Sequence, residues 1–205
     1  MTCRVKICGI TNHEDAQMAC RYGADALGFV FYEKSPRYIT PETANSIVAS
    51  LPPFVTPVAL FVDANSDVID SVIKGSSRWM IQFHGTESES ECVSYQRPYM
   101  KALRIKKGDD VAALVSGFLS ATAILLDAYK AGVPGGTGEV FDWSLIPGEL
   151  PKPVVLAGGL TPENIKEAIK QVAPYAVDVS GGVELSKGIK SEPKVQEFIS
   201  GAKCG

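Results

Sequence analysis

The stretch VVLAGGLTPENIKEAIKQV, residues Val154–Val172, contains the pattern of one complete strand-and-helix unit. It begins with the apolar run VVLA, which is typical of a short strand covered on both faces. Thr161 and Pro162 follow a pair of glycines, and a capping residue before a proline is typical of a helix start. Four apolar residues then recur on one helical face: Ile165, Ala168, Ile169 and Val172.

Similar apolar runs occur along the rest of the chain, at intervals of roughly 20 to 30 residues, which fits one strand and one helix per interval. Because they are almost continuously apolar and do not alternate, they predict a parallel sheet covered on both faces. The runs are Val5–Cys8, Ala26–Val30, Val58–Val62, Trp79–Phe83, Met100–Ile105, Ala123–Asp127 and Ala176–Val179.

Capping and stop signals separate these runs. Thr11 with Glu14 three residues later predicts a capping box, and Thr40 precedes another first-turn proline. Gly23 and Gly75 lie where helices are expected to end. The long segment 128–150 is rich in glycine and proline, so we expect a long loop and a short helix there.

Eight such units without a break in composition predict an α/β fold, a single (β/α)₈ TIM barrel over residues 1–205. The alternative is an open doubly wound sheet, which is expected to carry a glycine-rich dinucleotide turn after its first strand. The corresponding turn, CGITN at residues 8–12, has one glycine, which favours the barrel.

Composition narrows the classes of function. The formal net charge is -3, which does not favour binding to nucleic acid or to an anionic membrane. No apolar run reaches the roughly 20 residues that span a bilayer, and MTCRVKICG lacks a secretory signal, so we expect a cytoplasmic protein. The five cysteines include no C-x-x-C pair, and the two histidines are far apart. We therefore expect neither a disulfide framework nor a metal site.

Two glycine pairs follow the last two predicted strands. In a TIM barrel, the loops after the strands form the active-site face, and the seventh and eighth loops often hold a phosphate. Gly158, Gly159, Gly181 and Gly182, with Ser180, are therefore candidates to bind a phosphate through backbone N–H groups. The alternative is that the glycines only make turns.

Cys8 and Asp127 each end a predicted strand. A carboxyl group at the end of a buried strand tends to have a raised pKa, which suits a general acid, although a helix cap or an ion pair explains such a residue equally well. A thiol, with an ordinary pKa of about 8.5, serves as a base when that pKa is lowered, whereas many cysteines only fill the core. One acid facing one base suits a proton-shuttling isomerisation. The rival is nucleophilic catalysis by Cys8 with His84 as its base.

Three polar residues are further candidates for substrate binding. Arg37, in SPRYI, follows the second predicted strand and offers a fork that holds a carboxylate, unless it is a solvated surface arginine. Gln82 and His84, in IQFHG, either line a pocket or cap the end of their strand.

Taken together, the motifs KICGIT, ADALGFVFYEKSPRYITPE, IQFHG, LLDA, GGTGEVFDW, AGGLTPENI and AVDVSGGVE closely resemble the phosphoribosylanthranilate isomerases of tryptophan biosynthesis. The resemblance runs from Lys6 to Glu184. It implies an isomerase that performs an Amadori rearrangement, converting N-(5-phosphoribosyl)anthranilate to 1-(2-carboxyphenylamino)-1-deoxyribulose 5-phosphate, with no cofactor and no metal.

The resemblance also implies roles for individual residues. Cys8 of the KICG motif is the general base that removes a proton from C2, and Asp127 of LLD is the general acid that protonates the ring oxygen. Arg37 is expected near the anthranilate carboxylate. The residues expected to bind the phosphate or other parts of the substrate are Gln82, His84, Gly158, Gly159, Asp178, Ser180, Gly181 and Gly182.

Two alternative functions remain open when only the residues, and not the resemblance, are considered. A sugar-phosphate isomerase of the histidine pathway is expected to have an aspartate where Cys8 stands. A non-catalytic barrel that binds a phosphorylated metabolite needs the glycine loops but neither Cys8 nor Asp127. We expect a phosphorylated small molecule as the partner, no nucleic acid, no membrane, and a monomer.

Overall fold

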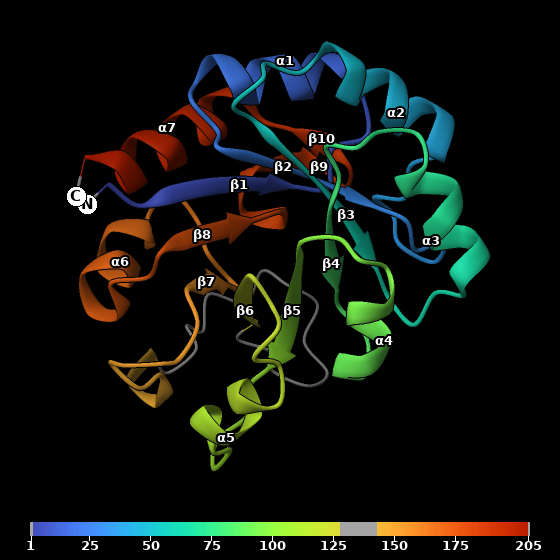
Figure 1. Ribbon diagram of the computed structural model, residues 1–205. Coiled ribbons are helices and arrows are strands. Elements are labelled where there is room, and N and C mark those ends of the chain that lie inside the picture. Colours follow the sequence, from blue (N-terminus) through green and yellow to red (C-terminus); the bar gives the residue numbers. More distant parts are fainter. Residues whose placement is uncertain (1, 128–142, 205) are drawn as a thin grey trace.

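The computed structural model describes residues 2–127 and 143–204, in which eight parallel strands close into a barrel (Figure 1). The strands follow one another around the barrel in chain order, and β8 pairs with β1 to close it. They are β1 (Arg4–Cys8), β2 (Ala26–Val30), β3 (Thr56–Phe61), β4 (Met80–Phe83), β5 (Tyr99–Arg104), β6 (Ala123–Asp127), β7 (Val154–Ala157) and β8 (Ala176–Val179). The barrel prediction is confirmed, and the closed strand order excludes the open sheet.

Helices surround the barrel and alternate with its strands. They are α1 (His13–Arg21), α2 (Pro41–Ser50), α3 (Ser66–Ile73), α4 (Glu89–Ser94), α5 (Val111–Ser116), α6 (Ile165–Val172) and α7 (Glu192–Lys203). Short 3-10 turns cover Trp143–Leu145 and Gly181–Val183, and a small hairpin of β9 (Glu184–Ser186) and β10 (Ile189–Lys190) precedes α7. The expected loop at 128–150 lies largely outside the described residues.

The first predicted helix cap is wrong by one residue. Asn12, and not Thr11, caps α1, because its Oδ1 accepts a hydrogen bond from the Asp15 amide at 2.8 Å. The hydroxyl of Thr11 instead donates to the carbonyl of Gly188 in the turn between β9 and β10, 2.6 Å away. A contact made with a distant part of the chain therefore occupies the hydroxyl of Thr11, and Asn12 caps the helix.

The start of α6 is also later than predicted. Thr161 and Pro162 open a turn, and the helix begins at Ile165, whose amide donates to the Thr161 carbonyl at 3.1 Å. The Thr161 amide in turn donates to Oδ1 of Asn164 at 2.8 Å. The end signal at Gly23 is confirmed, since this glycine follows α1 with φ of +96°.

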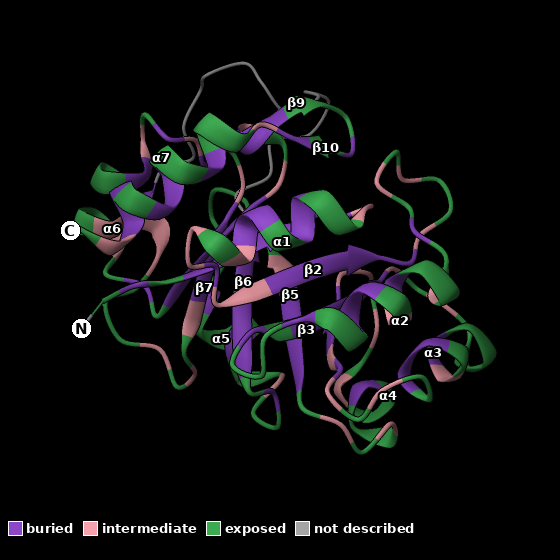
Figure 2. Cartoon of the chain, turned by 90° about the horizontal axis from the view of Figure 1, so that it is seen from above, coloured by how far each residue is buried: buried purple, intermediate pink, exposed green. Residues whose placement is uncertain are grey.

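Alternation along the strands separates two apolar layers. Residues such as Ile7, Phe29 and Ile81 point outward and pack beneath the helices. A second cluster, which includes Val58, Leu125 and other small or aliphatic side chains, fills the barrel interior. Figure 2 shows the strands buried and the outer faces of the helices exposed. Within the described ranges, no helix has the length and apolar character needed to cross a membrane.

Candidate active site

Cys8 lies inside the barrel at the carboxyl end of β1. Its side chain packs with Val30 and Leu60, which hold the equivalent inward positions near the ends of β2 and β3. Only 5% of the residue is exposed. The thiol is therefore a buried group at the edge of the interior, on the face where barrel enzymes bind their substrates.

Asp127 closes β6 on the same face. Because side chains alternate along a strand and Leu125 fills the barrel interior, Asp127 also points inward. Its Oδ2 lies 3.3 Å from Nε2 of His84, which directly follows β4. On one side of the barrel β7 and β8 stand between β6 and β1, so Asp127 and Cys8 occupy different walls of one rim.

A chain of hydrogen bonds connects Asp127 to the interior through His84. Nδ1 of His84 lies 2.9 Å from Nε2 of the fully buried Gln82. With the Gln82 amide donating to Nδ1, the imidazole carries its proton on Nε2 and donates to an ionised Asp127. With the amide reversed, Nδ1 carries the proton and Nε2 accepts one from a protonated Asp127. The chain therefore accommodates both protonation states of the carboxyl group.

The glycine loops after β7 and β8 meet each other. Gly158 and Gly159 have positive φ angles of 82° and 66°, a conformation that favours glycine. Gly182 packs so closely on the loop after β7 that a Cβ atom there would overlap the Leu160 carbonyl oxygen. The buried hydroxyl oxygen of Ser180 has no hydrogen-bond partner within residues 2–127 and 143–204. An unsatisfied buried hydroxyl beside two glycine loops is what a site for an anion requires.

We expect Gly182→Ala to lower the free energy of unfolding by about 1–3 kcal/mol, because the added methyl group forces the two loops apart. Urea denaturation measures this change. Gly148→Ala is the matched control, since a Cβ at Gly148 meets nothing within 4 Å and its backbone is not in the left-handed region. Equal stability of the two variants would contradict the close contact between the loops.

Arg37 reaches the end of the barrel from the loop after β2. Its guanidinium makes a two-bond fork with Glu184, with Nε to Oε1 and Nη2 to Oε2 both at 2.7 Å. Its stem lies over Gly9, and Nη2 lies beside Gly181. Arg37 is thus not a solvated surface arginine, although the carboxylate that it holds in this structure belongs to the protein.

The sequence analysis did not predict three charged residues that lie in this region: Lys6, Glu184 and Lys190. Nζ of Lys6 donates to Asp178 at 2.8 Å, inside the barrel. Nζ of Lys190 donates to the Cys8 carbonyl at 2.6 Å and to Glu184 at 3.1 Å. A lysine within the apolar run VKIC is the one local signal for them, because a buried lysine needs a partner.

The predicted residues form two groups. Arg37, Asp178, Ser180 and Gly181 lie with Cys8 around the ends of β1 and β8, whereas Gln82 and His84 lie with Asp127 around β4 and β6. Burial raises the pKa of the Cys8 thiol, and the nearby Lys6 ammonium opposes that effect. Burial also lowers the pKa of the Lys190 ammonium, against the influence of Glu184.

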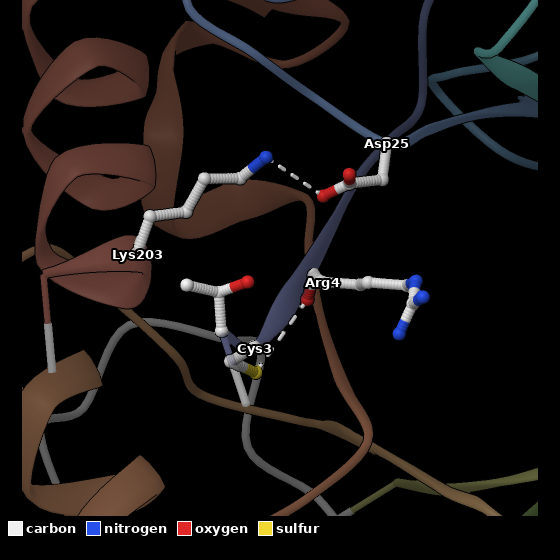
Figure 3. Close-up of a pocket in the computed structure, with 5 residues that line it drawn as sticks. Cys3, Arg4, Asp25 and Lys203 are labelled. Carbon is white, nitrogen blue, oxygen red and sulfur yellow. Dashed lines mark hydrogen bonds and ion pairs between the residues drawn. The ribbon is translucent and has the colours of Figure 1, made fainter.

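A cavity of about 290 Å³ lies at the opposite, amino-terminal end of the barrel (Figure 3). Thr2, Cys3 and Arg4 line it beside an ion pair of 3.0 Å between Lys203 and Asp25. This end of a TIM barrel serves stability and not chemistry. Burial raises the pKa of Cys3 to about 11, which leaves that thiol uncharged near neutral pH.

Known proteins resemble the whole chain. The family described as N-(5′-phosphoribosyl)anthranilate (PRA) isomerase matches residues 5–201. The N-(5′-phosphoribosyl)anthranilate isomerase of Marinomonas sp. (strain MWYL1) is 80% identical over 205 residues, which cover 100% of both chains. That of Pseudomonas fluorescens (strain Pf0-1) is 57% identical over 200 residues, with 98% of each chain covered.

Solved structures give the same result. The phosphoribosyl anthranilate isomerase of Thermotoga maritima superposes with a TM-score of 0.89 at 42% identity, covering 99% of this chain and 100% of that one. A phosphoribosyl anthranilate isomerase in complex with reduced 1-(o-carboxyphenylamino)-1-deoxyribulose 5-phosphate has a TM-score of 0.85 at 40% identity, with the same coverage. The barrel, the glycine loops and these likenesses agree, and the chain belongs to the N-(5′-phosphoribosyl)anthranilate isomerase family of tryptophan biosynthesis.

Proposed function

We propose that this isomerase works by general acid–base catalysis between two walls of the barrel, with Asp127 as the acid and Cys8 as the base. The observation that carries the proposal is that both side chains face the interior at the carboxyl ends of their strands. A substrate bound over the rim then has one proton donor and one proton acceptor beside it.

In the first step, Asp127 gives its proton to the ring oxygen of the furanose. The bond between C1 and that oxygen breaks, and the anthranilate nitrogen supplies the electron pair that forms a protonated Schiff base. The contact with His84 supports this role, because the Gln82–His84 chain accepts either state of the carboxyl group. The aspartate therefore keeps its hydrogen bond to His84 in both protonation states.

In the second step, Cys8 as thiolate removes the proton from C2. The electrons of the broken C–H bond form the double bond between C1 and C2 and neutralise the Schiff-base nitrogen, which gives the enol amine. One proton has been delivered to oxygen and one taken from carbon, so the reaction is an isomerisation without oxidant or reductant. Return of the proton from sulfur to Asp127, through solvent, restores the enzyme.

The two ends of the substrate have candidate sites on either side of this pair. We assign the phosphate to the backbone of Gly158, Gly159, Gly181 and Gly182, with the hydroxyl of Ser180. The complexed relative carries a 5-phosphate and a carboxyphenyl group on its ligand, which supports a site of this kind. Anions gain from clustered N–H groups of such loops.

We assign the anthranilate carboxylate to Arg37. A guanidinium has five N–H donors, and the fork with Glu184 occupies two of them, so donors remain for a second carboxylate. Gln82, His84 and Asp178 remain predictions as substrate-binding residues. Asp178 already accepts from Lys6, and it reaches a substrate only with an oxygen not taken by that bond.

The experiment that tests the proposed function is the decay of anthranilate fluorescence when the protein is added to freshly made phosphoribosylanthranilate. We expect a rapid, enzyme-dependent decay that vanishes when Cys8→Ala and Asp127→Asn are combined. A barrel that only binds a phosphorylated metabolite would bind the reduced product analogue without accelerating the decay, and that result would overturn the proposal.

Two further expectations concern the protein in the cell. We propose a cytoplasmic location, which agrees with the buried free thiols of Cys3, Cys8 and Cys92. The monomer also stays a prediction, and a related enzyme of Thermotoga maritima is described as dimeric. Light scattering during size exclusion gives the mass of the particle and decides between the two states.

A further inference from the structure

Lys6 is a buried lysine inside the barrel. It lies two residues before Cys8 on β1, so both side chains are on the inner face of the strand. The residue is 3% exposed, and its Nζ lies 2.8 Å from Oδ1 of Asp178, its register partner on β8. Removing two charges from water costs more than their mutual attraction commonly returns, so a buried ion pair is weak evidence for stability. The pair therefore calls for an explanation other than anchoring β1 to β8.

The position of Gly28 shows that the Lys6 ammonium and the Cys8 thiol lie near the same point on β2. A Cβ atom built on Gly28 would lie 2.8 Å from Sγ of Cys8 and 2.8 Å from Nζ of Lys6. Both atoms thus border one small space on the inner face of β2, which glycine leaves open. One ammonium N–H donates to Asp178, and the same ammonium acts on the Cys8 sulfur electrostatically.

Within the described residues, cations outnumber carboxylates among the charged groups that act on Cys8. Five of them act on the thiol or on its immediate partners, from β1, the loop after β2, β8, β9 and β10: the cations Lys6, Arg37 and Lys190, and the carboxylates Asp178 and Glu184. Asp178 neutralises one cation, and Glu184 lies between the other two. In the described part of the chain, a thiolate at Cys8 therefore has more cations than carboxylates acting on it.

Burial works against that thiolate. Desolvation raises the pKa of Cys8, and the Asp178 carboxylate adds to this effect. The ammonium groups of Lys6 and Lys190 lower the pKa, Lys6 more strongly. Lys190 also donates to the Cys8 carbonyl, whereas Nζ of Lys6 lies at the space beside Gly28 that the Cys8 sulfur also borders. Removal of the Lys6 charge is therefore expected to raise the pKa of Cys8 more than removal of the Lys190 charge.

From this geometry we propose that Lys6, oriented by Asp178, is a positioning residue that opposes the effect of burial and stabilises the thiolate form of Cys8. The inference rests on the proposed function, in which Cys8 is the base. Gly28 belongs to the same arrangement because any side chain there would press on both the ammonium and the sulfur.

The test measures ionisation of Cys8 directly, without turnover. The full-length protein is treated with iodoacetamide across a range of pH, and mass spectrometry resolves modification of Cys8 from that of Cys20. A cation within about 4–6 Å of an acidic group typically lowers its pKa by about 1–3 units. We therefore expect Lys6→Met to slow alkylation of Cys8 at neutral pH by about 10-fold or more, with an unchanged rate at Cys20.

Two variants separate this effect from loss of a buried charge. Gly28→Ala keeps Lys6 and Asp178 and places a methyl group within 2.8 Å of the positions of both Nζ and Sγ, which displaces one from the other. It is expected to slow Cys8 alkylation as Lys6→Met does, and it is the variant to use if Lys6→Met fails to fold. Lys101→Met is the matched control. Lys101 is equally buried and pairs with Glu87 at 2.7 Å, but it contacts the loop after β4 and not Cys8. It should leave the alkylation profile of Cys8 unchanged.

Turnover gives the second measurement. In Lys6→Met the acidic limb of the pH profile of kcat should move to higher pH, while KM changes little, and Lys6→Arg should restore part of the loss. Unchanged Cys8 alkylation in both Lys6→Met and Gly28→Ala would overturn the inference. If Cys8→Ala abolished turnover while the Lys6 and Gly28 variants alkylated normally, the proposed function would stand without the inference about Lys6. Normal turnover of Cys8→Ala would contradict both the proposed function and that inference.

Discussion

Replacing Cys8 by alanine is expected to lower kcat by about 10²- to 10⁴-fold, because a positioned general base contributes a factor of that size. The variant retains the glycine loops, Arg37 and Asp127, so affinity for the reduced product analogue should change little. Stopped-flow fluorescence with fresh substrate gives kcat, and titration with the analogue gives affinity. A loss in kcat without a loss in binding is the signature of an interaction made in the transition state.

The control for Cys8→Ala is Cys92→Ala. Cys92 is a fully buried free cysteine in α4, so its removal leaves a comparable cavity away from the rim. Burial raises its pKa to about 12, which prevents it from serving as a base near neutral pH. We expect Cys92→Ala to lose stability but to keep its kcat. Turnover of Cys8→Ala close to that of Cys92→Ala would contradict the role of the base.

Replacing Asp127 by asparagine is expected to lower kcat by a similar factor of about 10²–10⁴. The amide has nearly the shape of the carboxyl group and still hydrogen-bonds Nε2 of His84, so the site keeps its geometry. It has no acidic proton to give to the ring oxygen, and the furanose therefore opens slowly. The same stopped-flow assay measures the loss, and affinity for the product analogue should again be nearly unchanged.

Asp110→Asn is the matched control for this substitution. Asp110 caps α5 through a 3.0 Å bond from the Ala113 amide to its carboxylate, and asparagine caps helices about as well. The control should keep both its stability and its turnover. If Asp127→Asn retained wild-type kcat, another group would have to protonate the ring oxygen, and His84 would be the first candidate.

The barrel was predictable because each strand has a recognisable pattern in its own short stretch of sequence. Runs such as AILLD and VVLA agree with β6 and β7 residue for residue, since burial on both faces imposes a continuous apolar pattern. The carboxyl ends of parallel strands meet at one rim, so Cys8, His84 and Asp127 followed from the strand list without knowledge of their contacts.

The charged network beneath the rim was not predictable in this way. Arg37 and Glu184 are 147 residues apart, and the partner of Lys6 lies 172 residues away on β8. Such pairs depend on closure of the barrel and on the β9–β10 hairpin, which has no strong local pattern. The shifted cap at Asn12 has the same origin, because the hairpin turn takes the hydroxyl of Thr11.

The most direct test of the account is a crystal structure with the reduced product analogue bound. We expect the analogue to lie between β1 and β6, with Sγ of Cys8 near C2 and the Asp127 carboxyl group near the former ring oxygen, each within about 3–4 Å, the reach of proton transfer. An analogue that contacts only one of the two side chains, or that leaves both on the same side of the sugar, would contradict it.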